Sequence, residues 1–145
     1  MMKATTPKFL VVEDNDLDLE KIKRGFRRLG IENEIVHARD GIEALEILGG
    51  TEASPALSGQ FVVLLDLNMP RMNGLELLES IRQNPDISQT PVVVISTSNR
   101  AADVEAAYRR NVSGYLVKPM QTEKMYDALA TLKTYWESCE LPRNY

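Results

Sequence analysis

The sequence predicts an α/β fold in which helices cover both faces of a parallel sheet. Five short apolar runs, at residues 9–12, 34–38, 61–65, 92–95 and 114–117, have the length and composition of buried strands. Segments with apolar residues at helical spacing follow the runs, and this alternation with short connections implies right-handed crossovers between parallel strands. At 145 residues, the chain is long enough to bury the core of one domain.

The first two predicted helices carry capping signals. The first stops at Gly30, a residue type that commonly ends helices, and the second opens at Asp40 with Glu43 three residues later, as in a capping box. Their inward faces are marked by apolar residues at helical spacing: Leu19, Ile22, Phe26 and Leu29 in the first, and Ile42, Leu45 and Leu48 in the second.

The last three helices are predicted from similar patterns. We expect the third to follow Gly74, the fourth to be capped by Asn99, and the fifth to cover residues 122–136. The inward face of the third helix would carry Leu75, Leu78 and Ile81, and that of the fourth a thin apolar stripe of Val104, Ala107 and Tyr108. The inward face of the fifth would carry Met125, Leu129, Leu132 and Trp136.

Acidic residues follow two strands that should be neighbours. The alternation favours the flavodoxin-like (βα)5 arrangement, a doubly wound sheet with strand order 2-1-3-4-5, in which the first and third strands lie side by side. Glu13 and Asp14 follow the first strand and Asp66 follows the third, so their carboxylates would meet at one edge. They would repel one another unless a hard cation lay among them, and the grouping therefore predicts Mg²⁺.

Four separated motifs resemble the receiver domain of two-component response regulators. They are Val12-Glu13-Asp14-Asn15, the segment from Asp66 to Gly74, Ser96 after an apolar run, and Lys118-Pro119. The resemblance covers residues 8–136 and leaves 137–145 as a C-terminal tail. It implies that residues 1–145 form a single receiver domain with no room for an output domain.

The resemblance implies a role for each of these positions. Asp66 would accept a phosphoryl group from a sensor histidine kinase or a histidine phosphotransfer domain, and Lys118 and Ser96 would contact that group. Mg²⁺ would be held by Glu13, Asp14, Asp66 and the backbone carbonyl of Asn68.

Further positions would act in switching and in rate control. By the same resemblance, Ser96 and Tyr115 form the switch pair, and the peptide bond between Lys118 and Pro119 is cis. The residues that would tune the phosphate lifetime or border access to it are Asn68, Ser98 and Thr97.

The end of the chain resembles the small response regulators paired with bacterial phytochromes. Such regulators are single domains that form homodimers through the fourth helix, fifth strand and fifth helix. Tyr135 and Trp136 would then be interface residues. Trp136 could instead only close the core within the chain.

Other functions remain as alternatives. A chemotaxis-type receiver that binds a flagellar motor, or a phosphorelay intermediate, would share the same site. A haloacid-dehalogenase-like phosphatase would need Asp where Asn68 stands, so we expect no turnover enzyme beyond the chain's own phosphorylation and dephosphorylation. The intact acidic set, Ser96 and Lys118 also argue against an adaptor that is never phosphorylated.

Composition limits the partners and the compartment. The net charge of −4 and the pI near 5.1 give no general attraction for nucleic acid or anionic lipid. No apolar stretch approaches the roughly 18–20 residues needed to cross a bilayer. A single cysteine, Cys139, fits a reducing compartment, and His37 lacks a second ligand-type neighbour. We therefore expect a cytoplasmic protein without a membrane partner, in which His37 is structural.

Overall fold

A five-stranded parallel sheet lies at the centre of the protein, with strand order β2-β1-β3-β4-β5. In the computed structural model, which describes residues 7–50, 61–69, 71–118 and 121–142, the strands match the apolar runs to within one residue at each end. The predicted fold and strand order are therefore confirmed. The strands are β1 (Lys8–Val12), β2 (Ile35–Ala38), β3 (Phe61–Leu65), β4 (Val92–Ser96) and β5 (Gly114–Val117).

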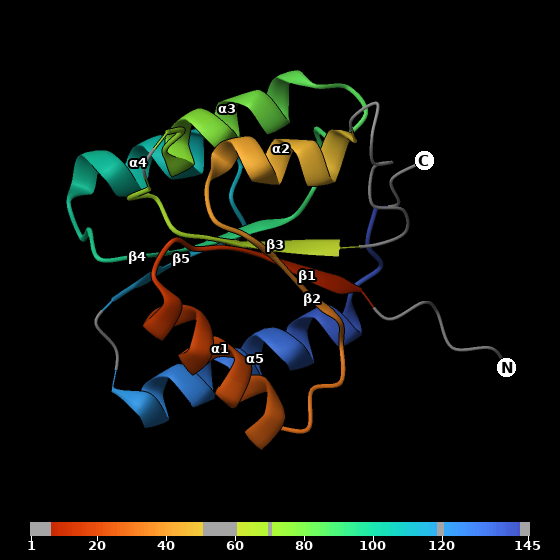
Figure 1. Ribbon diagram of the computed structural model, residues 1–145, viewed down its shortest axis with the longest axis vertical. Helices are drawn as coiled ribbons and strands as arrows, with labels where there is room; N and C mark the ends of the chain where they lie inside the picture. The colour runs from red at the N-terminus through yellow and green to blue at the C-terminus, as the bar shows by residue number, and fades with distance from the viewer. Residues whose placement is uncertain (1–6, 51–60, 70, 119–120, 143–145) are drawn as a thin grey trace, which may run out of the picture.

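Helices cover both faces of this sheet (Figure 1). The helices α2 (Gly41–Gly49), α3 (Gly74–Gln83) and α4 (Ala101–Arg109) lie on one face. The helices α1 (Asp16–Arg28) and α5 (Thr122–Ser138) lie side by side on the other. Within the described part of the chain, no helix combines the length and apolarity that a transmembrane span requires.

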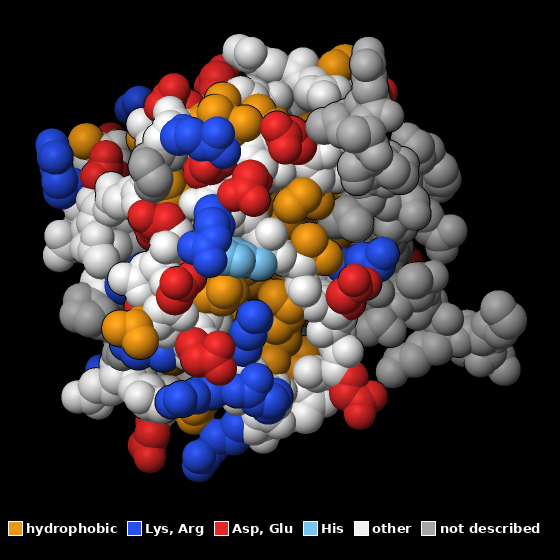
Figure 2. All heavy atoms as spheres, viewed as in Figure 1, with side chains coloured by type: hydrophobic (Ala, Val, Ile, Leu, Met, Phe, Trp, Pro, Cys, Tyr) orange, Lys and Arg blue, Asp and Glu red, His pale blue; other side chains and the backbone are white. Residues whose placement is uncertain are grey.

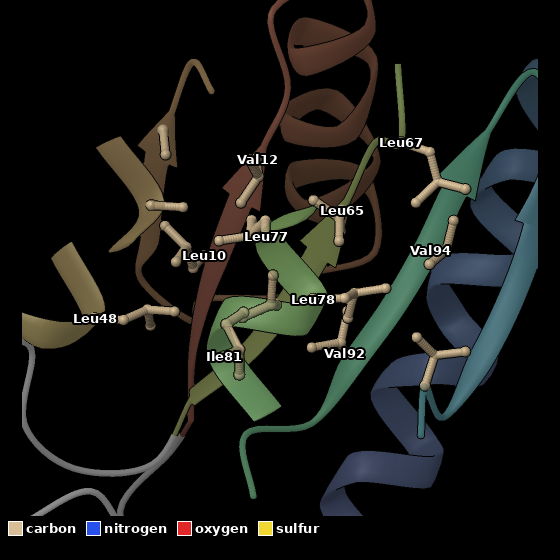
Figure 3. Close-up of a cluster of buried hydrophobic side chains, with 14 of the residues drawn as sticks. Leu10, Val12, Leu48, Leu65, Leu67, Leu77, Leu78, Ile81, Val92 and Val94 are labelled. Carbon is tan, nitrogen blue, oxygen red and sulfur yellow. The ribbon is translucent and has the colours of Figure 1, made fainter. Parts of the chain in front are cut away.

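Two apolar clusters hold the layers together. Because side chains alternate along each strand, Leu10 and Val12 point to one face of the sheet and Phe9 and Val11 to the other. Figure 3 shows the first cluster, where side chains of α2 and α3 pack onto β1, β3 and β4: Leu10, Val12, Leu48, Leu65, Leu67, Leu77, Leu78, Ile81, Val92 and Val94. The second cluster joins the sheet to α1 and α5 through Leu19, Ile22, Phe26, Met125, Leu129 and Trp136.

The predicted caps hold for the first two helices, but the capping box at Asp40 is only half formed, because the Glu43 carboxylate accepts from the N–H of Arg39. Gly30 follows the C-cap of α1 with φ of 68°, and the N–H groups of Gly30 and Ile31 donate to the carbonyls of Arg27 and Phe26, as in a Schellman motif. Asp40 caps α2 by accepting from the N–H of Glu43. These caps set where α1 ends and where α2 begins.

The predictions for α3 and α4 need correction. α3 is capped by a reciprocal box between Asn73 and Glu76, and it buries Leu77 where the sequence pattern favoured Leu75. Asn99 does not cap α4: the helix begins after Arg100, without a side-chain cap. In α4 only Ala107 is fully buried, because the helix covers the sheet edge with one narrow face. The predicted faces of α1 and α5 are confirmed.

Register places the acidic residues level with one another. Val12 pairs with Leu65, so Glu13 and Asp66 each follow a strand at the same edge of the sheet. The N–H of Asp66 donates to the carbonyl of Val12 at 3.0 Å and fixes this alignment. The predicted cis bond to Pro119, like Pro70 and the end of the tail, lies outside the described residues.

Candidate functional site

Three carboxylates meet at the carboxyl edge of β1 and β3. One oxygen from each of Glu13, Asp14 and Asp66 lies within 4.8 Å of the others. Glu13 and Asp66 are buried, whereas Asp14 is exposed and opens the cluster to solvent. His37 lies beside this edge, and its Nε2 donates to the backbone carbonyl of Glu13 at 2.7 Å. This contact agrees with a structural role for His37.

Lys118 brings the balancing positive charge from the end of β5. Its Nζ lies 3.0 Å from Oε2 of Glu13, 2.8 Å from Oδ2 of Asp18 and 3.7 Å from Oδ2 of Asp66. The Lys118 side chain is only 7% exposed, so these carboxylates replace most of its hydration. The structure therefore brings together Asp66, Lys118 and the acidic residues that the sequence singled out.

Burial and charge shift the ionisation of the two most enclosed groups. Burial is the largest cause that raises the pKa of Glu13 to about 7, and the charge of Asp66 adds to it, while Lys118 opposes it. For Lys118, burial alone would lower the pKa. Its hydrogen bonds to Asp18 and Glu13 and the nearby negative charges instead raise the pKa above its ordinary value. The charged form of the Glu13 carboxylate is thus stabilised by the Lys118 ammonium beside it.

The donor set fits a hard divalent cation. Carboxylate oxygens are the ligands that Mg²⁺ prefers, and Glu13, Asp14 and Asp66 offer three of them from a narrow region. Asp14 faces solvent and leaves room for the waters that Mg²⁺ usually retains. These three residues could hold the ion; a contribution from the backbone carbonyl of Asn68 stays a prediction.

The segment after Asp66 is shaped around its carboxylate. The N–H of Asn68 donates to Oδ1 of Asp66 at 3.1 Å, and the Asn68 amide donates to Oγ1 of Thr97 at 3.0 Å. A Cβ on Gly74 would lie 2.6 Å from Cα of Leu67 and 2.8 Å from the carbonyl oxygen of Asp66. Only glycine therefore allows α3 to begin this close to the Asp66 backbone.

Hydroxyl groups from β4 and β5 form the neighbouring wall. Ser96 is fully buried at the end of β4, and its Oγ accepts from the N–H of Ser98 at 3.2 Å. The carbonyl of Ser98 accepts from the hydroxyl of Tyr115 at 2.8 Å, and the Ser98 hydroxyl donates to Asp103. The two predicted switch residues are thus linked through the backbone of the β4–α4 loop, while their switching role stays a prediction.

An open cavity of about 470 Å³ lies beside the cluster. Its wall combines acidic and amide side chains with apolar ones, and it reaches from the edge of β1 to the start of α4. The lining residues are Asp14, Leu67, Asn68, Met69, Asn73, Leu75 and Asp103. It gives an incoming group a path to the pocket on the side of Asp14.

Three residues of this region were missed in the sequence. Asp18 binds Lys118, and Asp103 binds Ser98. Arg71, on the loop after Asp66, forms an ion pair with Asp40 at the start of α2. A signal existed for Asp18, since it stands three residues after the helix cap Asn15 and hence in the first turn at the strand ends. Asp103 and Arg71 carry no comparable sequence signal.

The two aromatic residues proposed for an interface differ in exposure. Trp136 is 6% exposed and packs within the α1–α5 side of the core, whereas Tyr135 is 55% exposed. Their rings meet edge to face, 4.9 Å apart. Trp136 therefore does close the core within the chain, and a contact with a second subunit stays a prediction for both residues.

Comparison with known proteins finds relatives over most of the chain. A family model described as the response regulator receiver domain matches residues 9–130. The response regulator Rcp1 of Synechocystis sp. is 34% identical, over 97% of each chain. A probable methanogenesis regulatory protein, FilR2 of Methanothrix harundinacea, is 37% identical over 88% of this chain and 81% of its own.

Solved structures of similar proteins share the whole architecture. The phosphorylated cyanobacterial phytochrome response regulator RcpA superposes with a TM-score of 0.82 at 31% identity, over 95% of this chain and 99% of that one. The Mn²⁺-bound form of Rcp1 superposes with a TM-score of 0.82 at 33% identity, over 94% and 99% of the two chains. With the sheet order, the acidic cluster and Lys118 in place, the chain belongs to the response regulator receiver domain family.

Proposed function

We propose that this chain is a single-domain response regulator that accepts a phosphoryl group on Asp66 from a sensor histidine kinase, in a reaction that requires Mg²⁺. The observation that carries the proposal is the cluster of Glu13, Asp14 and Asp66 with the buried Lys118 ammonium beside Glu13 and Asp66. A phosphoryl group on Asp66 would lie among groups suited to its charge.

The chemistry follows from the arrangement of the side chains. A carboxylate oxygen of Asp66 attacks phosphorus, the phosphorus–nitrogen bond of the phosphohistidine breaks, and the imidazole leaves with that electron pair. Mg²⁺ held by Glu13, Asp14 and Asp66 would neutralise charge on the transferring group. Lys118 supplies a point charge to a phosphoryl oxygen, and the Ser96 hydroxyl can donate a hydrogen bond to another.

The output is proposed to be the face formed by α4, β5 and α5. Movement of the Ser96 side chain would disturb the loop that Tyr115 holds through Ser98. Among the described residues, four large hydrophobic side chains are exposed, and three of them belong to these elements: Tyr108, Val117 and Tyr135. Such exposed side chains suit a homodimer or a protein target.

A phytochrome-type kinase in the cytoplasm is the proposed donor. Rcp1 and RcpA support this, since the latter is a cyanobacterial phytochrome response regulator, and a further relative with a TM-score of 0.83 acts in red light signalling in R. palustris. Lys and Arg side chains gather over the C-terminal part of α1, whose last turn carries Arg27 and Arg28 (Figure 2). This basic region of α1 is complementary to an acidic surface on the kinase. We propose neither nucleic acid nor a membrane as a partner.

A chemotaxis-type receiver is the second candidate. Chemotaxis protein homologues of Campylobacter jejuni are 34% identical over 86% of this chain. A phosphorelay intermediate would share the same chemistry. Asn68 takes the place of the second aspartate of a phosphatase, which supports a switch over a turnover enzyme. Phosphotransfer from a purified phytochrome kinase, compared with transfer from a chemotaxis kinase, distinguishes these candidates by rate.

The primary test is intact-protein mass after incubation with Mg²⁺ and a small phosphodonor. We expect one added phosphoryl group, absent from Asp66→Asn and absent with EDTA. Size-exclusion chromatography with light scattering on the same samples reports any change of assembly. If both the donor and beryllofluoride, a stable phosphoryl mimic, leave the wild type unmodified, the proposed function is wrong.

A further inference from the structure

We propose that Asp18 is a positioning residue that holds the Lys118 ammonium away from Asp66 in the unphosphorylated protein and competes with the phosphoryl group for it. The inference rests on the proposed function, because it assigns Lys118 a phosphoryl oxygen as its partner in the modified state. It gives Asp18 a role that the acidic cluster and the switch residues do not have: opposing the phosphorylated state by holding Lys118.

The contacts of Lys118 are unequal. Its Nζ is 2.8 Å from Asp18 and 3.0 Å from Glu13, both hydrogen-bond distances, but 3.7 Å from Asp66. The ammonium is thus bound on the α1 side of the pocket, while the carboxylate to be modified has only a longer ionic contact. Asp18 is the nearest of the three carboxylates to this ammonium.

Asp18 is held in place by the start of α1. The side chain of Asn15 accepts from the N–H of Asp18 at 3.0 Å, which fixes Asp18 in the first turn. The next residue, Leu19, is buried in the core and prevents this turn from shifting. Lys21 lies 4.0 Å from the Asp18 carboxylate and is 56% exposed, so it competes weakly for it. The carboxylate is 26% exposed and therefore only partly screened by water.

A phosphoryl group on Asp66 changes this balance. It adds negative charge and strong acceptor oxygens at Asp66, which is the farthest of the three carboxylates from the Lys118 ammonium. Lys118 must loosen its bond to Asp18 to reach them, so the carboxylate opposes the modified state. Removing the Asp18 charge should therefore stabilise that state.

The first test needs neither metal nor phosphate. In metal-free protein, a double-mutant cycle between Asp18→Asn and Lys118→Met should show a coupling of about threefold or more in the unfolding equilibrium constant. The same cycle between Asp16→Asn and Lys118→Met should be additive. Asp16 lies in the same turn and carries the same charge, but it pairs with Arg39. Additive effects for Asp18 would overturn the inference.

The second test measures competition directly. Fluorine NMR in the presence of Mg²⁺ measures the affinity for beryllofluoride. We expect this affinity to increase about threefold or more in Asp18→Asn and to change little in Asp16→Asn. In Asp18→Glu it should return toward the wild-type value. Equal effects of Asp18→Asn and Asp16→Asn would reveal only a general charge effect and overturn the inference alone. A wild-type chain that binds no beryllofluoride would overturn the proposed function and this inference with it.

Discussion

Arg71 donates from Nε to Oδ2 of Asp40 at 2.6 Å, and this ion pair joins the loop after Asp66 to the start of α2. Arg71 adopts a φ of 62°, a left-handed conformation that is uncommon for a residue with a side chain. The N–H of Gly41 donates to the carbonyl of Met72 and adds a backbone link between the same segments. The shape of the loop beside the phosphoryl site therefore depends on a residue at the end of another strand.

Asp40→Asn should make the protein less stable at neutral pH but not in acid. The hydrogen bond from Arg71 is the largest cause that lowers the pKa of Asp40 below its ordinary value of 3.8. The charged form thus stabilises the folded state above the unfolded-state pKa, and this contribution is lost as the pH falls through the lower folded-state pKa. In urea unfolding, the deficit of the variant should shrink below a pH of about 4.

Two further variants test the origin of this effect. Asparagine at position 40 can still cap α2, but alanine cannot. Asp40→Ala should therefore lower the free energy of unfolding by about 1 kcal/mol more than Asp40→Asn does, and this extra loss should persist in acid. Asp86→Asn removes an exposed carboxylate and should show no comparable deficit at neutral pH. A deficit of Asp40→Asn that stays constant from neutral to acidic pH would contradict the role of its charge.

Gly74→Ala should destabilise the protein by about 1–3 kcal/mol, because its methyl group would meet the backbone of Asp66 and Leu67. It should also slow phosphorylation, since relief of that clash displaces Asp66. Gly49→Ala is the matched control: a Cβ there meets nothing within 4 Å, and we expect a gain of up to about 1 kcal/mol. Urea unfolding and the rate of mass increase measure both effects. Equal stabilities of the two variants would refute the close contact.

The sheet and the acidic cluster could be predicted because each depends on local signals. An apolar run of a few residues identifies a buried strand, and the alternation with helices fixes the order that places β1 beside β3. Once those strands are neighbours, Glu13 and Asp66 must meet, since both follow the strand ends directly. Their proximity therefore follows from topology and requires no knowledge of side-chain packing.

The contacts around Lys118 and the edge of α4 could not be predicted in this way. Asp18 and Lys118 are 100 residues apart. The first turn of α1 places Asp18 near the strand ends, but its contact with Lys118 depends on how the two side chains pack. For α4, the apolar residues Val104, Ala107 and Tyr108 at helical spacing predicted a buried stripe, but Tyr108 is 50% exposed. A helix at a sheet edge buries less than one at its centre, and the sequence pattern does not show where the edge lies.

Lys118→Met should leave the fold intact but lower its stability by about 1–3 kcal/mol, because Glu13 and Asp66 lose their buried positive partner. We expect phosphorylation of Asp66 to remain measurable while the phosphate-dependent change of the α4, β5 and α5 face is lost. Urea unfolding, intact mass and hydrogen exchange of the three elements provide the readouts. A normal exchange response upon phosphorylation would contradict the role of Lys118 in transmitting the signal.

Trp136→Ala and Tyr135→Ala should separate folding from assembly. Trp136 is buried between α5 and the sheet, so its truncation should cost about 3–5 kcal/mol of folding free energy. Tyr135 is largely exposed, and its truncation should leave unfolding almost unchanged while weakening self-association. Urea unfolding and light scattering over a concentration series measure the two effects. If Trp136→Ala instead kept the wild-type stability and lost only the dimer, the indole would belong to the interface and its packing in the core would be incidental.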